Sequence, residues 1–207
     1  MQEVKKIVVI GPESTGKSTL CEQLAAHYDT LWCPEYARKY LENLGTNYTY
    51  IDLLEIANGQ LALEEEYLRK VGSRESGVGS ERKINPLLQT LNHKPQTTNH
   101  KLLFIDTNMY VMKVWCEFVF EKCHQFILDE ITVRKYDLYL LCNIDLPWVE
   151  DELREYPDIE SRQMLYHIYK DLLINQDVPW TEISGNYEVR LQQAVAAVDK
   201  LIFSSPA

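Results

Sequence analysis

The sequence predicts an α/β fold, in which a mostly parallel sheet of about five strands lies between helices on both of its faces. Short, continuously apolar segments such as KKIVVI and LLFID alternate with longer segments whose apolar residues recur at helical spacing. A strand that is apolar throughout belongs in a sheet covered on both faces, and such sheets are mostly parallel. The 207 residues suffice for one substantial core, so we expect a single domain over residues 1–207.

The expected elements follow from these patterns. The apolar segments predict strands over Lys5–Ile10, Thr30–Cys33, Leu102–Asp106, Leu138–Cys142 and Trp180–Ile183. The amphipathic segments predict helices over Lys17–Tyr28, Ala37–Leu44, Ile51–Val71, Asn108–Phe120, Gln125–Arg134, Asp158–Asn175 and Tyr187–Phe203. The polar segment 72–101 contains three glycines and two prolines, and we expect an insertion or mobile loop there, with a short helix near residues 86–91.

The charge balance and the cysteines limit the class of protein. A net charge of −10 and a pI of about 5.0 repel phosphate backbones, so we expect no nucleic acid partner. We expect no membrane span and no signal peptide, because the apolar runs are too short. The five cysteines include no C-x-x-C pair, so we expect reduced thiols and a cytoplasmic location. The adjacent Cys123 and His124 form a weak metal pattern, and the oligomeric state is not indicated.

The segment GPESTGKS matches the phosphate-binding pattern G-x-x-x-x-G-K-S/T, the P-loop, between a predicted strand and a predicted helix. Its glycines allow successive N–H groups to point at phosphates, while Lys17 is expected to reach the β- and γ-phosphates of ATP. Ser18 is expected to bind Mg²⁺, and the fold to be the three-layer P-loop NTPase fold. Glu13 is interpreted as a tolerated residue within the loop. The loop residues expected to bind ATP are Gly11, Glu13, Ser14, Thr15, Gly16, Lys17, Ser18 and Thr19.

Two carboxylates are candidates for chemistry beside this loop. Asp106 ends the apolar strand LLFID, where it would hold Mg²⁺ or act as a base. Glu35 follows the second predicted strand, at the sheet edge where ligands of open α/β sheets bind, and Arg38 lies one helical turn later. Glu35 is equally explained as an acidic residue favoured at a helix N-terminus. The sequence leaves open whether Glu35 or Asp106 is the base.

The segment 148–165 is predicted to form a lid. It includes the turn-forming stretch DELREYPDIESR, which contains Arg154 and Arg162. Guanidinium groups on a lid would stabilise charge on a transferred phosphoryl group, although a solvated charged surface is the alternative interpretation. The sequence contains no HRD-type catalytic loop and no Asn-Lys-x-Asp motif, which excludes a protein kinase and disfavours a GTPase.

Several motifs together resemble a known family. In chain order they are GPESTGKSTL, PEYARKYLE, FIDTN, LPWVEDELR and NYEVRLQQAVAAV. These stretches resemble the ribosylnicotinamide kinase domain of NadR-type proteins, which are P-loop small-molecule kinases with an AAA-type ATP-binding domain. The resemblance touches nearly the whole chain apart from the segment 72–101. It implies ATP, Mg²⁺ and phosphorylation of a nucleoside 5′-hydroxyl, such as that of nicotinamide riboside.

The resemblance also implies roles for individual residues. The implied catalytic residues are Lys17, Glu35, Asp106 and Arg154. The implied substrate-binding residues are Glu35, Tyr36, Arg38, Asp106, Thr107 and Asn108. Ser184 and Gly185 are expected beside adenine, Arg154 is also expected to contact ATP, and Ser18 and Asp106 are the implied Mg²⁺ ligands. Further matching positions are Trp148, Asp151, Tyr187 and Arg190.

Three positions depart from the family pattern. Pro34 stands where the family commonly has Trp, Asn108 where Asp is expected, and Glu152 where Gly is usual. The identity of the phosphoryl acceptor therefore stays open at this point. The alternative hypothesis is a P-loop ATPase that acts as a nucleotide-dependent switch or binding module, which would consume ATP slowly and without stimulation by any nucleoside.

Overall fold

The computed structural model describes residues 3–42, 44–73 and 101–203. Most of the predicted insertion, and the short helix predicted within it, lie outside the described residues. The elements in chain order are β1 (Lys5–Ile10), α1 (Lys17–His27), β2 (Leu31–Cys33), α2 (Tyr36–Leu41), α3 (Tyr50–Ser73), β3 (Leu102–Asp106), α4 (Met109–Phe120), α5 (Gln125–Val133), β4 (Leu138–Cys142), α6 (Ile159–Ile174), β5 (Trp180–Ile183) and α7 (Tyr187–Phe203). Within the described ranges, no helix is both long enough and apolar enough to cross a membrane.

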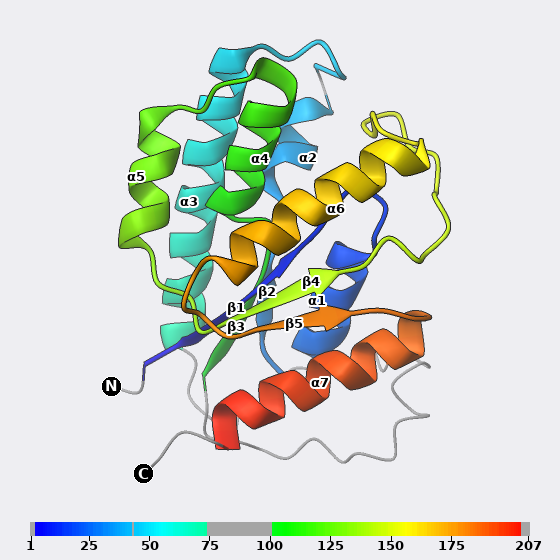
Figure 1. Cartoon of the computed structure of the whole chain (residues 1–207). Coiled ribbons are helices and arrows are strands. Elements are labelled where there is room, and N and C mark those ends of the chain that lie inside the picture. Colours follow the sequence, from blue (N-terminus) through cyan, green and yellow to red (C-terminus); the bar gives the residue numbers. More distant parts are fainter. Residues whose placement is uncertain (1–2, 43, 74–100, 204–207) are drawn as a thin grey trace.

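The five strands form one parallel sheet in the order β2-β3-β1-β4-β5. Helices α1 and α7 lie on one face of this sheet, whereas α3, α4 and α6 lie on the other (Figure 1). The predicted α/β fold with a parallel sheet between helices is therefore confirmed. Because all the strands run the same way, their carboxyl ends meet at one edge, which is where ligands bind in such sheets.

The continuous apolar character of the strands reflects this two-sided covering. In β1, Ile7 and Val9 pack into the core beneath α1 and α7, whereas Val8 and Ile10 pack toward α4 and α6. All four side chains have an exposed fraction of 0%. A strand buried on both faces has no position for a polar residue, so the alternation typical of half-exposed strands is missing.

A third core joins the helices on the side of α3 and α4 that faces away from the sheet centre. Side chains of α2, α3, α4 and α5 meet there, and the largest fully buried ones are Leu53, Ile56, Met109, Met112 and Ile127. This core fixes α2 and α4 relative to the carboxyl edge of the sheet. These two helices thereby supply a wall for the site described next.

Candidate active site

The loop between β1 and α1 requires glycine at two positions. Gly11 has φ 144°, and a Cβ atom there would lie 2.7 Å from the main-chain oxygen of Cys142. Gly16 has φ 78° and caps the N-terminus of α1. Other residues rarely adopt these angles, and the neighbouring β4 backbone leaves no room for a side chain at Gly11. Both glycines therefore supply backbone conformations that the loop requires.

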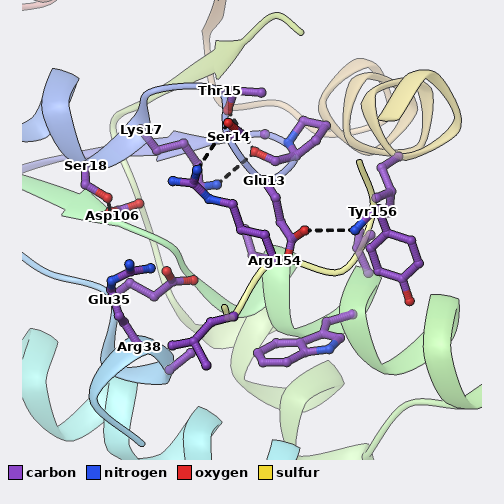
Figure 2. Close-up of a pocket in the computed structure, with 18 of the residues that line it drawn as sticks. Glu13, Ser14, Thr15, Lys17, Ser18, Glu35, Arg38, Asp106, Arg154 and Tyr156 are labelled. Atoms are coloured by element: carbon purple, nitrogen blue, oxygen red, sulfur yellow. Dashed lines mark hydrogen bonds between the residues drawn. The ribbon is translucent and has the colours of Figure 1, made fainter. Parts of the chain in front are cut away.

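The phosphate loop is curled around the main-chain oxygen of Pro12. The Thr15 hydroxyl donates to this oxygen at 2.8 Å, and the Lys17 ammonium donates to it at 3.0 Å. The loop leads into α1, whose N-terminal N–H groups favour an anion. Lys17 lies at the rim of the loop, where it can exchange a carbonyl partner for a phosphate oxygen (Figure 2).

Ser18, in the first turn of α1, and Asp106, at the end of β3, touch each other. The Ser18 hydroxyl donates to Asp106 Oδ2 at 2.5 Å, and the β1–β3 register pairs Val9 with Asp106. Asp106 has an exposed fraction of 0%, and its Oδ1 has no hydrogen-bond partner among the described residues. Burial, followed by the charge of Glu35, raises the pKa of Asp106 to about 6. A buried carboxylate oxygen without a partner, beside a hydroxyl, suits a hard cation such as Mg²⁺.

Glu35 faces Asp106 from the end of β2. It is the N-cap residue of α2, yet its side chain makes no capping hydrogen bond. Its Oε1 instead accepts a hydrogen bond from the Thr107 hydroxyl at 3.2 Å. Thr107 has φ 77°, a left-handed conformation that is strained for a β-branched residue and often marks functional sites. The Glu35 carboxylate is therefore available for chemistry, although its N-cap position also agrees with an acidic residue favoured at a helix N-terminus.

Gln60 of α3 holds the segment around Glu35, a role that the sequence analysis missed. Its Oε1 accepts a hydrogen bond from Tyr36 N at 2.7 Å, and its Nε2 donates to Pro34 O at 3.4 Å and to Asp106 O at 3.5 Å. The side chain is buried, with an exposed fraction of 1%. Gln60 thereby links the turn that carries Glu35 to the strand end that carries Asp106.

The neighbouring glycine of α3 has a matching role. A Cβ atom on Gly59 would lie 2.1 Å from Cε1 of the Tyr36 ring. Glycine inside a long helix costs about 1 kcal/mol relative to alanine, so its presence needs a local reason. The close approach of Tyr36 supplies that reason. A Gly-Gln pair within an otherwise helix-favouring segment is the one indication of this contact that the sequence offers.

The segment between β4 and α6 lies over the phosphate loop. Arg154 Nη1 donates to Ser14 Oγ at 3.3 Å and also to Val149 O (Figure 2). Val149 N donates to the same Ser14 hydroxyl at 2.9 Å. The guanidinium of Arg154 also lies 5.9 Å from the centre of the Trp148 ring. Arg154 thus lies beside the phosphate loop.

Glu13 joins the phosphate loop to the same segment. Its Oε2 accepts hydrogen bonds from Glu155 N at 2.9 Å and from Tyr156 N at 3.3 Å (Figure 2). Burial raises the pKa of the Glu13 carboxyl above its ordinary value. Glu13 is thus more than the tolerated loop residue that the sequence suggested, because it ties two parts of the site together. Arg38 of α2 makes a further tie through its ion pair with Asp151.

Arg162 has a different position from Arg154. It is 5% exposed, and its Nη2 donates to Ile144 O at 3.4 Å and to Leu146 O at 3.3 Å. Its guanidinium lies 5.5 Å from the centre of the Trp148 ring. Arg162 is not one of the described residues that line the cavity. It supports the loop after β4 from behind and does not face the phosphate loop.

A cavity of about 450 Å³ brings these groups together. Its polar end contains the sequence-predicted residues Gly11, Glu13, Ser14, Thr15, Gly16, Lys17, Ser18, Thr19, Glu35, Arg38, Asp106 and Arg154. Apolar and aromatic side chains, here called the aromatic end, complete the lining, among them Trp115, Phe118, Val119, Leu153, Tyr156, Leu165 and Tyr169. The sequence analysis missed this end, although the spacing of Trp115, Phe118 and Val119 places them on one face of a helix.

Three residues expected to bind substrate lie outside the cavity lining. Asn108 is 2% exposed and caps α4, with Oδ1 accepting from Tyr110 N at 3.1 Å and Nδ2 donating to Tyr139 OH at 3.2 Å. Tyr36 packs on Gly59, and Thr107 supports Glu35. None of the three is among the described residues that line the cavity, so they contribute to the site through their neighbours.

Ser184 and Gly185 lie at the carboxyl end of β5. Ser184 N donates to Gln193 Oε1 at 2.9 Å, and Gly185 N donates to Asp145 Oδ2 at 2.5 Å. Arg190 of α7 connects this turn to the phosphate loop, because it donates to Gly185 O at 2.8 Å and to Thr15 O at 2.9 Å. The turn is therefore fixed relative to the phosphate loop, on the same sheet edge but outside the lining of the cavity.

Curated proteins and solved structures resemble the chain over almost its whole length. The trifunctional NAD biosynthesis/regulator protein NadR of Salmonella typhimurium is 23% identical over 200 residues, covering 96% of this chain and 43% of the relative. The NadR of Escherichia coli has the same identity and coverage. The chain thus spans less than half the length of these relatives.

Solved structures agree with this likeness in fold. A crystal structure of NadR protein in complex with NR has a TM-score of 0.71 at 20% identity, and covers 99% of this chain and 51% of that one. A thymidylate kinase from Candida albicans has a TM-score of 0.55 at 14% identity, covering 98% and 92% respectively. The predicted P-loop NTPase fold and the resemblance to NadR-type proteins are confirmed. Residues 6–190 match the AAA domain family, and the chain belongs to that family.

Proposed function

We propose that this domain is an ATP-dependent kinase that transfers the γ-phosphoryl group to the 5′-hydroxyl of nicotinamide riboside. One observation carries the proposal: a cavity joins the phosphate loop, two facing carboxylates and an aromatic end. A nucleotide-hydrolysing switch needs the first of these parts but has no use for an aromatic compartment beyond the carboxylates. The similar NadR protein has been crystallised with NR, and also with NAD and AMP-PNP.

The donor end of the site would bind ATP and Mg²⁺. Lys17 would leave the Pro12 carbonyl and bind the β- and γ-phosphate oxygens, with the loop N–H groups around them. Ser18 and Asp106 fit Mg²⁺, because Asp106 Oδ1 is buried and unpartnered and both residues offer oxygen ligands. The ion, when bound, would supply positive charge beside the phosphates. The Ser184–Gly185 turn would lie beside adenine, as the family resemblance implies.

At the acceptor end, Glu35 is the better candidate for the base. Both carboxylates line the cavity, but Asp106 is fully buried and accepts a hydrogen bond from Ser18, which suits a metal ligand. Glu35 accepts a hydrogen bond only from the Thr107 hydroxyl. Glu35 would accept the proton of the 5′-hydroxyl as that oxygen forms its bond to the γ-phosphorus and the bond to the β-phosphate oxygen breaks. Lys17 and Arg154 would stabilise the negative charge on the transferred group.

We infer that residues 148–165 act as a lid on a single kinase domain. The support is the set of hydrogen bonds from this segment to Glu13 and Ser14 of the phosphate loop. A closed lid would exclude water and so limit hydrolysis of ATP. An ATP-dependent enzyme with five free cysteines also fits the cytoplasm, where thiols stay reduced.

The test is ADP formation by the purified protein with Mg-ATP, alone and with a panel of nucleosides that includes nicotinamide riboside, uridine and thymidine. We expect nicotinamide riboside to stimulate ADP formation by at least about a hundredfold, since an oriented hydroxyl replaces excluded water as the acceptor. Slow ADP formation that no nucleoside changes would favour the switch hypothesis and contradict the kinase.

A further inference from the structure

One carboxylate of the cavity lining has no role in phosphoryl transfer or in joining the phosphate loop to the segment after β4. Glu13 binds main-chain N–H groups, and Glu35 and Asp106 lie at the phosphate end. The fourth acidic residue of the lining is Glu155. Among the residues that the structure describes, no Lys, Arg or His side chain forms an ion pair with Glu155. Its neighbour Arg154 points instead to Ser14 and Val149 O.

The Glu155 carboxylate is held against the aromatic end of the cavity by a chain of two hydrogen bonds. The indole N–H of Trp115 donates to Tyr48 OH at 2.8 Å, and that hydroxyl donates to Glu155 Oε2 at 2.6 Å. The Tyr48 and Trp115 rings are also packed edge to face, with centres 5.0 Å apart. Tyr48 is 9% exposed, so water competes little with these bonds. The chain fixes the direction of a carboxylate beside an aromatic wall.

The rings around Glu155 are themselves fixed. Tyr156 packs edge to face on Phe118, with ring centres 5.0 Å apart, and both side chains line the cavity. Aromatic faces attract cations, and an unpaired carboxylate in a partly desolvated place attracts them more strongly. Partly removing a carboxylate from water without a nearby protein cation costs free energy, and a ligand that carries a positive charge would offset that cost.

We infer that Glu155, oriented by Trp115 and Tyr48, is a specificity-determining residue that selects an acceptor whose ring carries a positive charge. This inference rests on the proposed function for the identity of the acceptor. Nicotinamide riboside has a pyridinium ring with a permanent positive charge, whereas its dihydro form has nearly the same size and no charge. The flat cationic ring would lie against the aromatic wall with Glu155 at its edge. Asn108 has no part in this selection because it caps α4 outside the cavity lining.

The experiment compares binding and turnover of nicotinamide riboside and dihydronicotinamide riboside. Affinities are measured by titration calorimetry in the presence of AMP-PNP and Mg²⁺, and kcat/KM by ADP formation with ATP. The variants are Glu155→Gln, which keeps the shape and removes the charge, and Tyr48→Phe, which keeps the charge and removes its orienting donor. Glu150→Gln is the matched control, since Glu150 is an exposed glutamate of the same segment outside the cavity lining.

We expect Glu155→Gln to weaken nicotinamide riboside binding about tenfold and to change dihydronicotinamide riboside binding by less than about twofold. Tyr48→Phe should also weaken nicotinamide riboside binding, but by a smaller factor. Glu150→Gln should change neither affinity. Equal losses for both nucleosides, or no loss for either, would overturn the inference. Wild-type protein that binds nicotinamide riboside in a Glu155-dependent way but does not phosphorylate it would refute the proposed kinase and leave the inference standing. Wild-type protein that binds neither nucleoside would refute both.

Discussion

Replacing Gln60 with methionine isolates the contribution of one buried amide to the geometry of the site. Methionine has nearly the same length and shape as glutamine but cannot accept the hydrogen bond from Tyr36 N or donate to Pro34 O and Asp106 O. An unpaired buried donor costs about 1–3 kcal/mol. For a chain of this size, each kcal/mol corresponds to about 2–4 °C in Tm, so the expected fall in Tm is roughly 2–12 °C.

The kinetic consequence separates a positioning role from a merely structural one. Without its amide partner, the turn that carries Glu35 is free to move, and a displacement of about 1 Å at a reacting group costs on the order of a hundredfold in rate. We expect Gln60→Met to lower kcat about tenfold to a hundredfold and to leave the KM for ATP unchanged, because Gln60 does not touch the phosphate loop. The assay is steady-state ADP formation in the folded range of temperature.

The matched control is Gln23→Met. Gln23 is a buried glutamine of α1, with an exposed fraction of 6%, and it does not line the cavity. We expect this variant to retain the kcat of the wild-type protein. If Gln60→Met lowers Tm as calculated but keeps kcat within about twofold of wild type, the reasoning about Glu35 is refuted.

Two further predictions follow from the phosphate loop. Gly11→Ala places a Cβ atom 2.7 Å from Cys142 O at φ 144°, and we expect the resulting strain of about 1–3 kcal/mol to lower Tm by roughly 2–12 °C. The affinity for AMP-PNP, measured by calorimetric titration, should fall at least tenfold, and an unchanged affinity would contradict this account of the loop. Burial raises the pKa of the Glu13 carboxyl above its ordinary 4.5, so the folded protein keeps this proton to a higher pH than the unfolded chain does. The stability that this proton contributes is complete below pH 4.5 and is lost as the pH rises through the folded pKa. The Tm of wild type minus that of Glu13→Gln should therefore decrease as the pH rises from 4 to 7, and a difference that grows instead would show that this carboxyl has a lowered pKa.

Much of the fold could be predicted because most of its strands have a continuous apolar run bounded by polar residues, although the short strand Trp180–Ile183 includes Thr181 and Glu182. The strands Leu102–Asp106, Leu138–Cys142 and Trp180–Ile183 have the predicted bounds, as does the helix Tyr187–Phe203. Helix α3 differs, because it continues to Ser73 although the insertion was expected to begin at residue 72. A polar, glycine-containing end of an exposed helix carries no apolar pattern, so the sequence does not mark where it stops.

The site was predictable where a local pattern encodes the chemistry. The phosphate loop depends on a contiguous run of residues, and the structure places Lys17 and Ser18 of that run in the cavity lining. The role of Gln60, and the link that Glu13 makes to the segment after β4, were missed because the partners are distant in the chain: Gln60 and Asp106 are 46 positions apart, and Glu13 and Glu155 are 142 positions apart. Asn108 was expected to contact the substrate, but its amide satisfies the first turn of α4 and Tyr139 instead.

The transfer of labelled phosphate tests the central claim most directly. The purified protein is incubated with Mg²⁺, nicotinamide riboside and ATP labelled at the γ-phosphate, and the nucleoside product is separated and counted. We expect the label to appear in nicotinamide mononucleotide with the wild-type protein, and to fall by several orders of magnitude with Lys17→Ala, whose circular dichroism should be unchanged. Label that appears only in inorganic phosphate, or transfer that persists in Lys17→Ala, would contradict the account.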